Sequence, residues 1–100
     1  MEVVHAKCAG LDVHKESVVA CARVQRGRQI TRETATFATS TSGLLELARW
    51  LGEQEVTHVA MEATGVYWKP VWHVLEGGCE LVLGNAQHIR NVPGRKSDLK

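Results

Sequence analysis

The chain has 100 residues, enough for one domain, and its 44% hydrophobic and 23% charged residues are ordinary for a soluble globular protein. It has no apolar run of about 18 residues to span a bilayer and no basic-then-apolar leader, which excludes a membrane protein and indicates a cytoplasmic one. The net charge of +1 is unevenly spread, because residues 88–100 are basic while acids gather in the middle of the chain.

The first third of the chain predicts three antiparallel strands. Small and β-branched residues fill positions 3–12 and return at 18–24 after a polar break at 14–17, as in a β-hairpin. A third run, residues 29–37, alternates in the manner of a strand and follows a turn at Gly27.

Three cysteines, Cys8, Cys21 and Cys79, are an odd number at no metal-ligand spacing, so we expect them to pack rather than to take part in chemistry. If Asp12 pairs near Ser17 in the hairpin, Cys8 falls opposite Cys21. We expect these two thiols to be close but not bridged, because the cytosol keeps thiols reduced.

After the third strand the period changes to that of a helix, whose apolar face is made by Leu44, Leu45, Ala48 and Leu51. The Ser/Thr cluster at residues 40–42 offers N-caps for this helix. A short apolar strand at residues 56–62 follows.

A second helix is predicted to begin at Val66 or Tyr67 and to run to about residue 76, because Pro70 is tolerated only in the first turn. Residues 80–83 form a fifth strand, and residues 84–94 a loop. A further helix begins at Asp98 and is cut off at once, which indicates a C-terminally truncated domain fragment over residues 1–100.

The predicted order of three strands, helix, strand, helix and strand is that of the α/β ribonuclease H-like fold. In this fold a mixed five-stranded sheet has three antiparallel strands followed by two parallel ones, with flanking helices. The first and fourth strands are then neighbours, so we expect Asp12 and Glu62 to lie side by side at the carboxyl edge, where open α/β sheets bind ligands. A helix after the fifth strand would bring Asp98 over that edge.

Three carboxylates from three elements predict a site for a hard divalent cation, since Mg²⁺ takes oxygen ligands and acts together with substrate phosphates. Each acid alone also has a plainer interpretation. Asp12 is typical of a hairpin turn, Glu62 of an exposed acid ahead of a helix, and Asp98 of a first helical turn. The three acids together, in this order, favour the metal site.

The strings GLDVHKESVVAC, MEATGVYWKPVWHVLE and NVPGRKSDLK resemble the N-terminal, RuvC-like domain of DEDD-type insertion-sequence transposases, relatives of the Piv-type DNA invertases. The resemblance implies a DNA transposase or recombinase that cleaves and exchanges strands with two Mg²⁺ or Mn²⁺ ions. It assigns Asp12, Glu62 and Asp98 as catalytic metal ligands. The family's fourth acid lies three residues after the third, one position beyond Lys100, so we expect this fragment alone to be inactive.

The same resemblance implies DNA as a partner, a structured guide RNA in some members, and a homo-oligomer when the protein is full length. It also implies a downstream serine-bearing domain and a bacterial, nucleoid-associated protein. Lys15, Arg90, Arg95 and Lys96 are candidate nucleic-acid contacts, although a basic tail and a turn lysine are more often simply solvated.

Two other classes of function stay open. Sugar-kinase and actin-like ATPases also begin with an acid on a strand that enters a hairpin, but they hold phosphates in a small, Gly- and Ser/Thr-rich turn, and DVHKES is bulky there. The other class is a non-catalytic nucleic-acid-binding or assembly module with the same fold, against which the presence of all three acids argues.

Overall fold

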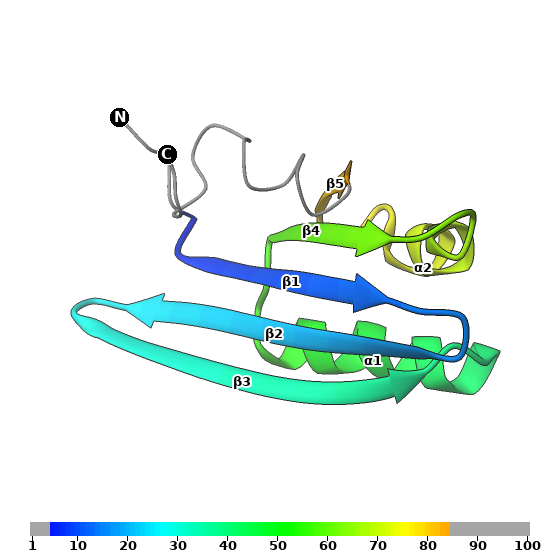
Figure 1. Ribbon diagram of the computed structural model, residues 1–100. Coiled ribbons are helices and arrows are strands. Elements are labelled where there is room, and N and C mark those ends of the chain that lie inside the picture. The colour runs from blue at the N-terminus through cyan, green and yellow to red at the C-terminus, as the bar shows by residue number, and fades with distance from the viewer. Residues whose placement is uncertain (1–4, 85–100) are drawn as a thin grey trace.

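The computed structural model describes residues 5–84, which form one mixed five-stranded sheet and two helices (Figure 1). In chain order the elements are β1 (Lys7–Val13), β2 (Ser17–Arg26), β3 (Gln29–Ala38), α1 (Thr41–Glu53), β4 (His58–Ala63), α2 (Trp68–Leu75) and β5 (Glu80–Gly84). The strand order across the sheet is β3-β2-β1-β4-β5. Strands β1, β2 and β3 are antiparallel, and β4 and β5 run parallel to β1, as the sequence predicted.

Alternation along the strands gives the sheet one buried and one open face. In β1 the side chains of Ala9, Leu11 and Val13 are buried, whereas Gly10 and Asp12 between them are exposed. Because successive side chains of a strand point to opposite faces, all the buried positions lie on one side of the sheet. Both helices contribute buried leucine or valine side chains to the same core, so both cover that side.

Helix α1 begins where Ser40 caps it, with the Gly43 backbone N–H donating to the Ser40 hydroxyl over 3.2 Å. The face it buries consists of Leu44, Leu47 and Leu51. The predicted face included Leu45, which is wrong, since that side chain is 58% exposed. Leu44, Leu45 and Leu47 are close enough in sequence to fit either of two adjacent faces of the helix. Packing on the sheet buries the face centred on Leu47 and leaves Leu45 in solvent.

Helix α2 starts at Trp68, one or two residues later than predicted, so Pro70 is its third residue. The proline therefore lies within the first turn, where its missing N–H leaves no helical hydrogen bond unmade. The helix ends at Leu75, and Gly77 follows with a φ of 89°, a left-handed conformation that glycine adopts without strain.

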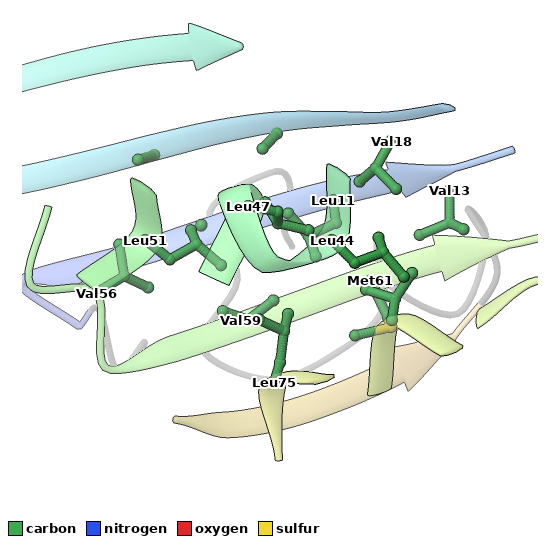
Figure 2. Close-up of a cluster of buried hydrophobic side chains, with 14 residues drawn as sticks. Leu11, Val13, Val18, Leu44, Leu47, Leu51, Val56, Val59, Met61 and Leu75 are labelled. Atoms are coloured by element: carbon green, nitrogen blue, oxygen red, sulfur yellow. The ribbon is translucent and has the colours of Figure 1, made fainter. Parts of the chain in front are cut away.

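The core lies between the sheet and the two helices (Figure 2). Leu47 and Met61 are the largest side chains that are fully enclosed, and no polar or charged residue within residues 5–84 is buried. Removing one such side chain from water stabilises the fold by about 1.5–3 kcal/mol. At the edge of the core, the ring centroids of Phe37 and Trp50 are 5.6 Å apart, a contact that links β3 to α1. No helix in the described part of the chain is long and apolar enough to cross a membrane.

The hairpin register differs from the predicted one by two residues. Cys8 pairs with Arg23, and Cys21 pairs with Gly10, so the expectation that Cys8 lies opposite Cys21 is wrong. The reason is that β1 continues to Val13, which pairs with Val18, and burial of both side chains in the core pins the register there. The cysteines of this part are free, but Cys21 is exposed rather than packed.

The fourth strand begins later than predicted, at His58 instead of residue 56. Val56 is buried, yet it lies in the turn that follows α1, where its N–H donates to the carbonyl of Leu51 over 3.0 Å. Glu55 immediately before it has a φ of 60°, which turns the chain from the helix toward the sheet. An apolar residue at a helix end is therefore easily mistaken for the first residue of a strand.

Candidate functional site

Asp12 and Glu62 are direct partners in the parallel ladder between β1 and β4. Both lie on the open face of the sheet, because their neighbours Leu11 and Met61 point into the core. The Asp12 side chain is 60% exposed. The predicted placement of these two acids side by side near the carboxyl ends of their strands is confirmed, and the pair is accessible to a ligand from solvent.

Three hydrogen bonds stabilise the turn after Asp12. The His14 backbone N–H donates to the Ser17 carbonyl over 2.8 Å, which closes the turn. The Thr39 hydroxyl donates to the Lys15 carbonyl over 2.8 Å, and the Thr39 N–H donates to the Glu16 carbonyl over 3.3 Å. Thr39 thus ties the turn to the end of β3, a role that local sequence patterns do not reveal because its partners are far away in the chain.

His14 and Lys15 follow Asp12 in this turn, and both are exposed. The Nε2 atom of His14 is 3.8 Å from a carboxylate oxygen of Asp12, so a protonated imidazole forms an ion pair with that acid. The turn therefore brings the His14 imidazole beside Asp12, and Lys15 follows as an exposed basic side chain in the same turn.

Glu62 lies one residue before the end of β4, where the chain turns into α2 through Gly65 with a φ of 57°. On its far side the ladder pairs Glu62 with Gly84 of β5. Asp12, Glu62 and Gly84 therefore form one row across three strands. Gly84 has no side chain, so within residues 5–84 this strand adds no side-chain bulk beside Glu62.

Two of the three residues in the next row of the open face are small. Gly10 of β1 pairs with Ala60 of β4, and Ala60 pairs with Val82 of β5. Among the described residues, Gly10, Ala60 and Gly84 therefore place little side-chain bulk beside the two acids.

The third predicted acid, Asp98, and three of the four predicted nucleic-acid contacts, Arg90, Arg95 and Lys96, lie outside the described residues. Within residues 5–84, no three His, Cys, Asp or Glu side chains form a group that could hold a metal ion. This part of the chain therefore supplies two carboxylates. Mg²⁺ sites in phosphoryl-transfer proteins commonly use one or two carboxylates plus substrate phosphate, so the pair fits such an ion.

The cysteines stand apart from the acids in position and chemistry. Burial raises the pKa of the Cys8 thiol, and the neighbouring Arg23 only partly opposes that rise. Burial likewise raises the pKa of Cys79, which packs against the core. Both thiols are therefore protonated at neutral pH, which makes them poor nucleophiles and poor metal ligands.

A groove between α2 and β5 is lined by Trp68, Lys69, Trp72, His73, Glu76 and Leu83. Trp68 and Trp72 meet edge to face at 5.8 Å, and both pack partly against the core. Leu83 points to the helix side of the sheet, so this groove is on the face opposite the acids. Its tryptophans act in packing and are not part of the acid site.

Comparison with known families decides the class of protein. The family model DEDD_Tnp_IS110, described as a transposase, matches residues 9–100. The chain belongs to this family. Of the function classes that the sequence left open, membership of a transposase family disfavours the ATPase class. No curated protein matches the chain.

Solved structures similar to this transposase-family chain show the fold alone. A Ppx/GppA family member from Aquifex aeolicus has a TM-score of 0.54 at 14% identity, over 84% of this chain and 36% of that one. A second structure of the Aquifex aeolicus PPX-GPPA enzyme has the same TM-score and identity, over 83% of this chain and 37% of the other. The chain thus spans little more than a third of these proteins.

Proposed function

We propose that the chain is the ribonuclease H-like catalytic domain fragment of a bacterial insertion-sequence transposase or recombinase, and that Asp12 and Glu62 are two of its Mg²⁺ or Mn²⁺ ligands. The single observation that supports this most strongly is the pairing of Asp12 with Glu62 on the open face of the sheet, in a chain of the transposase family. Asp98 is the proposed third ligand, and the full site takes two ions.

The chemistry of the pair suits phosphodiester cleavage. Ions held there would polarise the scissile phosphate and lower the pKa of the attacking water or hydroxyl. The protein's own part is to fix the two carboxylates on rigid, neighbouring strands, which sets the position of the reacting phosphate. Lys15, which is exposed in the turn after Asp12, would pair with an adjacent phosphate of the DNA backbone.

The remainder of the proposal concerns the whole protein. The complete active site also needs Asp98, the family's fourth acid three residues after it, and a downstream serine-bearing domain. Residues 1–100 alone are therefore inactive in strand cleavage. Arg90, Arg95 and Lys96 contact nucleic acid, which is DNA and, in guided members, a structured RNA. The full-length protein acts in the bacterial cytoplasm at the nucleoid, as a homo-oligomer.

Metal binding by the chain itself tests the assignment. Titration with Mn²⁺, followed by electron paramagnetic resonance of the free ion, should show weak binding by the wild-type chain, because substrate phosphate is missing. Asp12→Asn and Glu62→Gln should each weaken it further, since each removes one anionic ligand. Glu80→Gln is the matched control, because Glu80 is an exposed acid on the same open face of the sheet, in the row of His58.

Binding that is unchanged in both Asp12→Asn and Glu62→Gln would refute the metal site. The same two substitutions in the full-length protein should abolish metal-dependent DNA strand cleavage while leaving DNA binding intact. A non-catalytic binding module, the alternative function, predicts DNA binding without metal-dependent cleavage even in the full-length wild type.

A further inference from the structure

Strand β3 is a long and regular edge strand. It is the terminal strand of the sheet and pairs with β2 alone among the described elements. In an antiparallel ladder alternate residues direct their N–H and C=O groups toward the neighbouring strand, and the rest direct them away. Half of the backbone polar groups of β3 therefore face outward, where another strand can bind them.

Natural edge strands are commonly kept short, bulged, or marked with proline or charged residues, above all lysine, which prevents pairing with other chains. β3 has only one of these features, the charges of Arg32 and Glu33. It is ten residues long, pairs one-to-one with β2 over its whole length and contains no proline or lysine. All its residues except Ala35 and Phe37 are exposed.

We propose that β3 is the interface for a second copy of this chain, with the two β3 strands pairing antiparallel to make one continuous sheet. Such a contact is isologous, because the same strand is used on both sides of a twofold axis. The axis is perpendicular to the sheet, so the helices of both copies lie on one side. Both Asp12–Glu62 pairs then lie together on the other side.

The charges of β3 select the register of this pairing. Residues directly opposite each other in an antiparallel pair share a face of the sheet, so the twofold axis passes through a residue of β3 rather than between two. An axis at Arg32 puts two arginines opposite each other, and an axis at Glu33 does the same with two glutamates. Like charges directly opposite are destabilising.

An axis at Thr34 avoids both conflicts. Thr34 then faces Thr34 of the second copy, a cross-strand pair that is favourable in sheets. Arg32 faces Thr36, and Glu33 faces Ala35. The overlap extends over residues 30–38 of each copy, and an axis at Ala35 or further along shortens it. The register centred on Thr34 is therefore the longest one without opposed like charges.

The apolar side chains of the edge agree with this register. Ile30 is 40% exposed, one of the large hydrophobic side chains that the described chain leaves in solvent. In the pairing centred on Thr34 it lies opposite Ala38 of the second copy. Contact there removes part of the Ile30 surface from water at each end of the interface.

Charge reversal tests both the surface and the register. We expect sedimentation equilibrium of the 100-residue chain to show a concentration-dependent dimer. Thr36→Lys places two new lysines opposite the two Arg32 side chains and should weaken the dimer about two- to thirtyfold, whereas Thr36→Glu should strengthen it. The double variant Arg32→Glu with Thr36→Lys restores opposite charges and should recover wild-type dimerisation.

Two further variants complete the set. Thr34→Lys should weaken the dimer, because it opposes two lysines at the axis. Val66→Lys, an exposed position in the turn before α2, is the control and should leave the dimer unchanged. If the chain stays monomeric at protein concentrations up to about 1 mM, the free energy of dimerisation is smaller than about 4 kcal/mol and the proposal is overturned. So does a dimer that responds to Thr36→Lys but is not recovered by the double variant, or one that ignores every β3 substitution.

Discussion

Asp12 of β1 and Glu62 of β4 stand opposite each other in the parallel ladder, on the face of the sheet that the helices leave open. Two carboxylates at directly opposite positions repel each other, and a bound divalent cation relieves that repulsion. The same pair should therefore weaken the fold without metal and stabilise it with metal.

We predict that Glu62→Gln raises the free energy of unfolding of the metal-free chain by about 0.2–1 kcal/mol, the usual range for a cross-strand pair. Millimolar Mn²⁺ should raise the unfolding midpoint of the wild type, because the ion binds only the folded state, and should leave the midpoint of Glu62→Gln unchanged. Chemical unfolding with and without Mn²⁺ measures both effects. An equal response of the two proteins to Mn²⁺ would contradict the pair as a metal site.

Gly43, in the first turn of α1, is the site of the second prediction. A Cβ atom at this position would overlap the backbone carbonyl of Ala38, at the end of β3. Gly43→Ala should therefore lower the free energy of unfolding by about 1–3 kcal/mol, as overpacking does, despite the better helix propensity of alanine. Thermal unfolding followed by circular dichroism is a sufficient measurement.

Gly52 provides the matched control, because it lies in the same helix and a Cβ atom there meets nothing within 4 Å. Gly52→Ala should stabilise the chain by about 0.5–1 kcal/mol through helix propensity alone. Opposite signs for the two substitutions are the expected result. A stabilising Gly43→Ala would mean that α1 can move away from β3.

The order and direction of the strands could be predicted from the sequence because hydrophobic periodicity is local. Alternation from Lys7 to Val13 and the apolar face around Leu47 reflect one buried side per element. The right-handed crossover rule then orders the parallel strands. That order alone is enough to bring Asp12 beside Glu62, which is why half of the proposed site followed from the sequence.

Register and helix rotation could not be predicted in the same way. Whether Cys8 faces Cys21 or Arg23 depends on how long the turn after Val13 is, and a shift of two residues keeps every side chain on its own face. The hydrophobic pattern is therefore equally satisfied by both registers. Leu45 and Leu47 likewise compete for the core through contacts with distant strands, which no local pattern contains.

The thiols are the subject of the third prediction. Unfolded, non-reduced protein should titrate as three free thiols, since the chain has three cysteines and those in the structure are free. In the native protein at pH 8, Cys21 should react with a disulfide reagent much faster than the others. It is exposed, whereas burial raises the pKa of Cys8 and of Cys79 and so lowers their thiolate fraction.

Stopped-flow absorbance with the disulfide reagent resolves the reactive classes, and Cys21→Ser should remove the fast phase alone. Cys8→Ser, the control, should leave the fast phase and remove part of the slow one. A count of one thiol in the unfolded protein would instead reveal a disulfide and contradict the expectation of unbridged cysteines.

The last prediction concerns Glu55, which joins the end of α1 to the β1–β2 hairpin. Its carboxylate accepts hydrogen bonds from the Lys7 ammonium over 2.6 Å and from the Arg26 guanidinium over 3.0 Å. These bonds, that of Lys7 foremost, hold the pKa of Glu55 below its usual value. A carboxyl with a lower pKa in the folded state adds stability above its unfolded pKa and loses it as the pH falls through the folded pKa.

We therefore expect Glu55→Gln to be less stable than the wild type at pH 7, because glutamine keeps the size of the side chain and removes its charge. The difference should shrink as the pH falls below about 4.3, the unfolded pKa of glutamate, and should also shrink at 1 M salt, since the pair is exposed and screened. Denaturant unfolding at several pH values measures it. Glu53→Gln is the control, as Glu53 is an exposed acid at the end of the same helix, and its effect should not follow this pH course. A Glu55→Gln deficit that persists unchanged at pH 3 would show that the side chain acts through packing or backbone conformation, not through its ion pairs with Lys7 and Arg26.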